Sequence, residues 1–136
     1  MTDWTFAQKA LVVLASLQLL WATAGFVAEP SFQIGAGAPT EKVLGVDFNG
    51  IHALSGFLLF LPAFYFARRP DWAFYYDVYA AAALYITGIW AFFDEQPAWV
   101  FAFPSNAADG IFHLATGTMF AVLATVQGAE NRSALG

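Results

Sequence analysis

The sequence predicts an all-α fold: a polytopic membrane four-helix bundle made of two tandem helical hairpins. The composition is the first reason, because 60% of the 136 residues are hydrophobic and only 11% are charged. A soluble domain is typically about 45–50% apolar and about 25% charged, since water must solvate its surface. The second reason is that uncharged runs recur near the length that a helix needs to cross a bilayer core, roughly 20 residues.

Four such segments divide the chain, and together they form a single transmembrane domain over residues 1–136. The expected spans are approximately residues 6–28, 47–67, 72–93 and 108–128. Glu29-Pro30 ends the first, and Arg68-Arg69-Pro70 ends the second, since a proline disfavours αR at the residue before it. Ala22-Thr23-Ala24 resembles the cleavage site of a signal peptide, but we expect the first segment to be a true span.

Local signals refine the second, third and fourth segments. Side-chain oxygens that can cap a helix N-terminus precede two of them, Asp47 or Asn49 before the second and Ser105 or Asn106 before the fourth. Pro62 should bend the second helix. Asp77 is the one acid well inside a predicted span. We expect an ion pair with Arg68 or Arg69 across the short loop, with a proton relay as the alternative.

The basic residues predict the orientation. In a chain that runs up, down, up and down, Lys42 lies on one side of the membrane, and four basic residues share the other side with the two termini: Lys9, Arg68, Arg69 and Arg132. The positive-inside rule then places both termini in the cytoplasm, in a multi-pass protein of the cell membrane. The scarcity of lysine and a pI near 4.6 are typical of proteins from salt-loving archaea.

Several functional classes are excluded by composition. A net charge of -5 is unsuitable for general nucleic-acid binding, because few cations are available to neutralise phosphates. The absence of cysteine excludes disulfides and thiolate metal sites. The sequence also lacks a phosphate-cradling glycine-rich loop and a Ser-His-Asp arrangement with suitable neighbours. We therefore do not expect an enzyme, unless a bound cofactor supplies the chemistry.

A repeated motif suggests that the two halves, approximately residues 1–67 and 68–136, arose by duplication. Asn49 precedes His52 and Gly56 in the first half, and Asp109 precedes His113 and Gly117 in the second. A unit with an even number of spans keeps its orientation when it is copied. We therefore expect a pseudo-twofold axis along the membrane normal, although chance similarity between apolar segments is the alternative.

With four spans, short loops and this duplicated motif, the chain resembles a family of small prokaryotic membrane proteins classed as a domain of unknown function. The resemblance covers nearly the whole chain and implies the four-span topology without implying an activity. The pair Asp109-Gly110 departs from the Asp-Asn that the family motif leads us to expect.

His52 and His113 are the only histidines, and we expect them at matching depth near the external ends of two helices. Three interpretations remain open. In the first, the two histidine rings hydrogen-bond to Asn49, Asp109 or water, while Gly56 and Gly117 allow close helix packing. Alternatively, they are axial ligands of haem b, with the two glycines accommodating the macrocycle. In the third, His52, His113 and a carboxylate bind a divalent metal, the candidate carboxylates being Asp109, Glu29 and Asp94.

The function that composition favours is that of a membrane scaffold or accessory subunit. Four short helices expose much apolar and aromatic surface, which suits packing in lipid against another copy of the chain or a larger membrane complex. The alternative is a haem-binding or metal-binding membrane protein that uses the two histidines.

Overall fold

Helices dominate the structure, a computed structural model that describes residues 4–35, 37–93 and 104–134. The helices and the two short strands follow the chain in this order: α1 (Phe6–Ala28), β1 (Glu41–Val43), β2 (Val46–Phe48), α2 (Gly50–Phe60), α3 (Ala63–Phe66), α4 (Pro70–Trp90) and α5 (Ala107–Ser133). Each of the four predicted segments is helical, which confirms the mostly helical fold. The last helix continues beyond its predicted end, residue 128, to Ser133.

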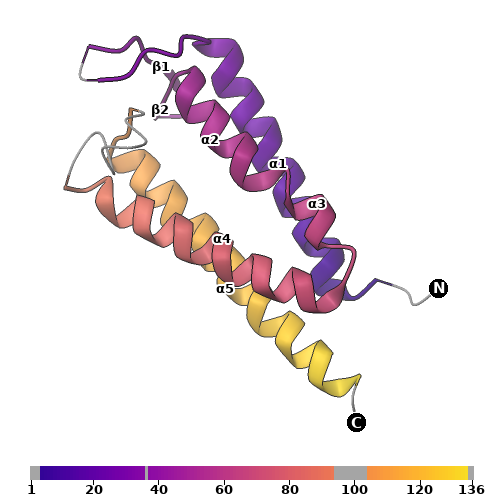
Figure 1. Cartoon of the computed structure of the whole chain (residues 1–136). Helices are drawn as coiled ribbons and strands as arrows, with labels where there is room; N and C mark the ends of the chain where they lie inside the picture. Colours follow the sequence, from indigo (N-terminus) through magenta and orange to yellow (C-terminus); the bar gives the residue numbers. More distant parts are fainter. Residues whose placement is uncertain (1–3, 36, 94–103, 135–136) are drawn as a thin grey trace.

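The helices form two layers. In Figure 1, α1 lies beside α2 and α3, and α4 lies beside α5 in the second layer. The start of α1 and the end of α5 lie at one end of the molecule, and the strands lie at the other. The up-and-down course that the sequence predicts is therefore present within the described residues.

Asparagine side chains begin two of the helices. The Asn49 side chain accepts a hydrogen bond from the backbone N–H of His52 at the start of α2. The Asn106 side chain accepts one from the backbone N–H of Asp109 at the start of α5. Each cap satisfies a backbone donor that the first turn leaves unpaired. Of the two pairs of candidates, the asparagines are thus the caps.

Pro62 was expected to bend the second helix, and it interrupts the helix between α2 and α3. The two helices continue in nearly the same direction in Figure 1. Together they form one interrupted helix, which lies beside α1 in the first layer.

A small β-hairpin joins α1 to α2, and the sequence analysis did not predict it. Strands β1 and β2 are antiparallel, with Glu41 opposite Phe48 and Val43 opposite Val46. The turn is Leu44-Gly45, and both residues have positive φ, 51° and 88°. Type I′ turns require this conformation, but leucine adopts it rarely. The hairpin buries Phe48 beside α2.

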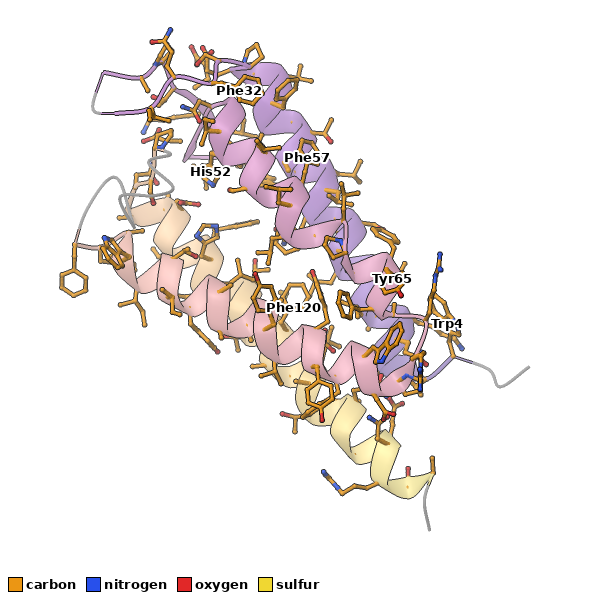
Figure 2. All side chains as sticks on the ribbon, in the orientation of Figure 1. Trp4, Phe32, His52, Phe57, Tyr65 and Phe120 are labelled. Atoms are coloured by element: carbon orange, nitrogen blue, oxygen red, sulfur yellow. The ribbon has the colours of Figure 1, made fainter. Side chains whose placement is uncertain are left out.

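The core lies where the two layers meet. Phe60 stacks on Phe120 with ring centroids 6.0 Å apart, and Tyr76 contacts Phe120 edge-on. The Tyr76 hydroxyl donates to the Leu59 carbonyl at 2.6 Å. Figure 2 shows Phe120 between the two layers. These contacts join α4 and α5 to the interrupted α2–α3 helix.

Glycines allow α4 and α5 to pack closely. A Cβ at Gly110 would lie 2.9 Å from the Gly88 carbonyl oxygen, which is too close for any other residue type without a shift. A Cβ at Gly88 would likewise lie 3.0 Å from the Gly110 carbonyl oxygen. Small residues at helix crossings are typical of membrane helix packing.

Two of the described helices, α1 and α5, are long and apolar enough to cross a membrane by length and composition. Large apolar side chains are exposed on both, including Leu17 and Leu20 on α1 and Met119 and Val122 on α5.

The expected ion pair of Asp77 is wrong. Asp77 is fully buried in α4, and neither carboxylate oxygen has a hydrogen-bond partner among the described residues. The two arginines instead lie over aromatic rings, Arg68 over Tyr65 at 5.5 Å and Arg69 over Trp72 at 4.8 Å. Guanidinium groups stack well on such rings, so both arginines stay at the α3–α4 turn.

We predict that Phe120→Ala destabilises the fold, because it removes a fully buried ring that two other rings contact. Phenylalanine-to-alanine changes in protein cores cost about 3–5 kcal/mol. Unfolding of the purified protein in mild detergent, followed by tryptophan fluorescence, measures the loss. The control is Phe6→Ala, since Phe6 is 68% exposed. Equal effects of the two substitutions would contradict the assigned core.

Candidate metal centre

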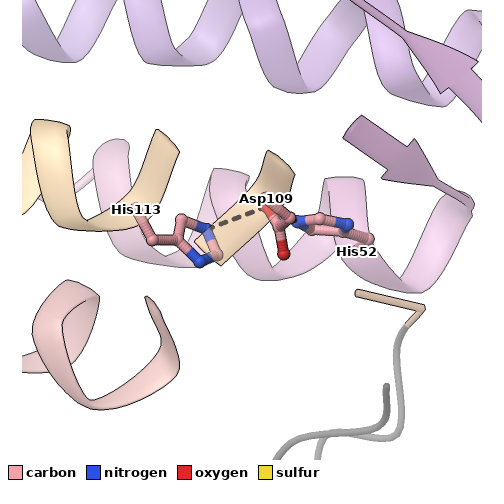
Figure 3. Close-up of side chains that lie close together, drawn as sticks. All are labelled: His52, Asp109 and His113. Atoms are coloured by element: carbon pink, nitrogen blue, oxygen red, sulfur yellow. Dashed lines mark ion pairs between the residues drawn. The ribbon is translucent and has the colours of Figure 1, made fainter. Parts of the chain in front are cut away.

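Three candidate ligands converge at the hairpin end of the molecule. The Nε2 atoms of His52 and His113 each lie 3.6 Å from Oδ1 of Asp109. One ligand atom from each residue can be chosen so that all three lie within 4.8 Å of one another. Figure 3 shows the carboxylate between the two rings. His52 comes from the first half of the chain, and the other two come from α5.

The N-terminal caps place these residues. His52 is the third residue of α2, and Asp109 is the third residue of α5, each donating its backbone N–H to the capping asparagine. His113 is one turn further along α5, on the same face as Asp109. The expectation that the two histidines lie at matching depth in their helices is therefore wrong, because it is Asp109 that takes the position equivalent to His52.

The His52 ring is held in one orientation. Its Nδ1 lies 2.8 Å from the Asp47 carbonyl oxygen, which can only accept a hydrogen bond. Nδ1 therefore carries a proton, and in the neutral ring the lone pair is on Nε2, the atom nearest Asp109. A histidine that binds a metal through one nitrogen usually donates from the other in this way. Phe48 stacks on the ring at 4.3 Å and limits its rotation.

Asp109 is oriented through its second oxygen. The Ser105 hydroxyl donates to Oδ2 at 2.8 Å, which leaves Oδ1 toward the histidines. A separation of 3.6 Å is too long for a hydrogen bond. Around a tetrahedral zinc ion with ligands at about 2.1 Å, however, neighbouring ligand atoms lie roughly 3.4 Å apart. The two separations from Asp109 Oδ1 are therefore close to that spacing, and the two histidine nitrogens lie within 4.8 Å of each other.

The buried charge of Asp109 requires compensation. The residue is 1% exposed, and in the described part of the chain neither lysine nor arginine forms an ion pair with it. A buried carboxylate without a positive partner is costly. Either a protonated imidazole or a bound cation would supply the missing positive charge.

His113 is less constrained than His52. Its Nε2 faces Asp109, while its Nδ1 is buried without a hydrogen-bond partner among the described residues. The ring contacts His52 edge-on, with centroids 6.0 Å apart. Its backbone is anchored by close packing, since a Cβ at Gly88 would lie 3.0 Å from the His113 Cβ.

The two motif glycines serve close helix contacts. A Cβ at Gly56 would lie 3.1 Å from the Ala22 Cβ of α1, and a Cβ at Gly117 would lie 3.2 Å from the Leu84 Cβ of α4. Gly56 also borders the cavity beside the histidines, whereas Gly117 does not. This placement agrees with the interpretation in which the glycines allow helices to approach each other.

Of the other two candidate carboxylates, the structure describes Glu29. Glu29 accepts a hydrogen bond from the Ser31 backbone N–H and is not part of the group formed by His52, Asp109 and His113. Asp94 lies outside the described residues. Asp109 is thus the carboxylate that the structure brings to the histidines.

Sequence reasoning missed the groups that surround the three ligands. The Asp47 carbonyl is a backbone group, so no residue type signals its role. Trp21 stacks on Phe112 at 5.0 Å beside the site, but aromatic residues are too frequent in this chain for either to be singled out. Ser105 could have been found, because it lies four residues before Asp109.

A cavity of about 540 Å³ adjoins the three ligands. Its wall includes residues from α1, α2, α4 and α5, so it lies between the two layers. His52, Asp109 and His113 all border it. An ion held by them would therefore face this space.

Comparison with known proteins identifies the family. No curated protein and no solved structure matches the chain. Residues 8–126 match the family model described as a domain of unknown function, DUF4383. The match includes all three candidate ligands and most of the chain. The chain therefore belongs to the DUF4383 family, which confirms the expectation of a domain of unknown function.

Proposed function

We propose that this protein is a membrane protein that binds one divalent transition-metal ion through His52, Asp109 and His113. The observation that carries the proposal is the position of Asp109 Oδ1, which is buried and 3.6 Å from both Nε2 atoms. A divalent ion at the centre would satisfy the carboxylate and both imidazoles at once.

The ligand types narrow the class of metal. Imidazole suits zinc, iron, copper and nickel, whereas calcium and magnesium prefer sites made of oxygen ligands. Two histidines and one carboxylate occur in catalytic zinc sites and in non-haem iron sites, where further coordination positions stay open. We therefore propose a first-row transition metal, with at least one coordination position directed toward the cavity.

A bare ion is favoured over haem. Two axial histidines must lie on opposite faces of a flat macrocycle. Here Asp109 Oδ1 lies 3.6 Å from both Nε2 atoms, in space that the macrocycle would need. The nearest external lysine, Lys42, already pairs with Asp47 at 3.2 Å and so is not free for a propionate. A Soret band that His52→Ala abolishes would favour haem instead.

We further propose that all four helical segments cross the membrane. Support comes from the apolar length of α1 and α5 and from exposed apolar residues on the other two segments, such as Leu58 on α2 and Tyr79 on α4. By the distribution of lysine and arginine, the termini are cytoplasmic and the metal centre is near the external face. Glu29 and Glu41 at that end would attract cations.

The role as a scaffold or accessory subunit stays a prediction. It depends on exposed apolar surface, which lipid would cover equally well in the proposed placement. The same holds for assembly into a homo-oligomer or a larger complex, and for the pseudo-twofold relation of the halves. The proposed role is metal binding, and we assign no reaction to it.

We predict that the purified protein, stripped with a chelator, binds one Co²⁺ or Zn²⁺ per chain. His52→Ala, His113→Ala and Asp109→Asn should each weaken binding by more than about 100-fold, since each removes a ligand. Ser105→Ala should weaken it by about 10–100-fold, the usual effect of losing a group that orients a ligand. Calorimetry and the visible spectrum of bound cobalt measure both effects.

The matched control is Asp47→Asn. This substitution removes a nearby acidic side chain but keeps the backbone carbonyl that accepts from His52. Its cobalt affinity should stay within a few-fold of the wild type. If all the variants bind cobalt as tightly as the wild type, the metal centre is disproved.

We predict the membrane orientation from single cysteines, which report cleanly because the chain has none of its own. Thr40→Cys, before β1, should react with an impermeant maleimide in intact cells. Ser133→Cys, at the end of α5, should react only after the membrane is permeabilised. Both positions are exposed. The reverse pattern would contradict the orientation, and equal labelling in a soluble fraction would contradict membrane insertion.

A further inference from the structure

Exposed side chains of two helices border the cavity beside the proposed metal centre. Its lining includes Leu54 and Leu58 of α2 and Tyr79 of α4, which are 41%, 67% and 63% exposed. The Tyr76 hydroxyl of α4 reaches the Leu59 carbonyl of α2 at 2.6 Å, but the two backbones are not closely packed within the described residues. Figure 2 shows α2 and α4 in separate layers. In the proposed membrane placement, the cavity therefore opens sideways toward the lipid.

The cavity has a polar end and an apolar body. His52, Asp109 and His113 lie together near the β-hairpin, where the His52 ring contacts Asp47 and Phe48 of β2. Away from them the wall is formed mainly by aliphatic and aromatic side chains, among them Leu59, Phe60 and Leu84. Pockets of roughly 300–1,000 Å³ with few polar groups are typical sites for small organic ligands. The lining thus matches a molecule that is polar at one end and apolar along the rest.

The charge of the proposed centre specifies the polar end. A divalent ion with one carboxylate and two neutral imidazoles has a net charge of about +1. An unbalanced charge in apolar surroundings is costly. Among the described residues that line the cavity, Asp109 is the one acid, while Asp47 pairs with Lys42 and Glu29 accepts from the Ser31 backbone N–H. An anionic oxygen from a ligand would balance the charge and fill an open coordination position.

We propose that the cavity binds a long-chain carboxylate of the fatty-acid type. Its carboxylate coordinates the ion, and its alkyl chain enters between α2 and α4 and lies in the apolar part of the cavity. This inference rests on the proposed function, because the ion supplies the positive charge.

The test uses the full chain, purified in a neutral detergent and loaded with Co²⁺. Dodecanoate is titrated at a fixed detergent concentration, with dodecanol and dodecyltrimethylammonium as neutral and cationic probes of the same chain length. Dodecanoate alone should change the cobalt absorption spectrum, and the change should saturate. Acetate, which has the same head without the chain, should need at least about 100-fold higher concentration, because it buries no alkyl chain in the apolar body.

Two alanines on α4 provide a matched pair of variants. Ala83 lines the cavity, and its neighbour Ala82 is exposed and does not. Ala83→Phe should fill the space for the alkyl chain and weaken the response to dodecanoate at least tenfold, while cobalt binding is retained. Ala82→Phe should leave both responses unchanged.

The outcomes separate the two proposals. If cobalt does not bind, the proposed function fails, and this inference fails with it. If cobalt binds but dodecanoate has no effect, or if dodecanol changes the spectrum equally, the metal centre stands and the carboxylate ligand is disproved. An unchanged response in Ala83→Phe would also place the chain outside this cavity and overturn the inference.

Discussion

The arrangement of this protein depends on one buried carboxylate. Asp109 is almost completely inaccessible, and two histidine rings on different helices each lie 3.6 Å from its Oδ1. A carboxylate in such a place needs positive charge nearby. The histidine of α2 can supply this charge only if α2 and α5 stay together at the hairpin end. The Asp109 carboxylate therefore belongs to the candidate site and also links the two layers.

The rest of the structure supports this junction from both ends. Near the site, the Asn106 side chain donates to the Gly45 carbonyl in the β-turn, which ties the start of α5 to the hairpin. At the opposite end, the Thr5 hydroxyl donates to Gln127, and the Glu130 carboxylate accepts from backbone N–H groups at the start of α1. A negative charge at a helix N-terminus is favourable. Between the ends, the layers separate enough to leave a cavity.

The helices and the site residues could be predicted because they follow from composition and short-range pattern. Apolar runs marked the helical segments, and the paired motif marked His52, Asp109 and His113. The hairpin was missed because Leu44 stands where a type I′ turn favours Asn, Asp or Gly. The ion pair of Asp77 was wrongly expected because the sequence does not show where the Arg68 and Arg69 side chains point, and both lie over aromatic rings. The positions of His52 and His113 in their helices were misjudged, because the capping asparagine sets where each helix begins and the histidine lies at a different distance from the cap in each half.

The distribution of ligands has a thermodynamic consequence. An ion held by His52 on one layer and by two residues of the other layer binds only when the layers are in their observed positions. Part of its binding free energy is therefore spent on holding the layers together, as in other proteins whose metal site forms on folding. The cavity wall is built from both layers, so the ion would also keep the shape of the cavity. With an ion bound, the candidate site would therefore also join the two layers of the bundle.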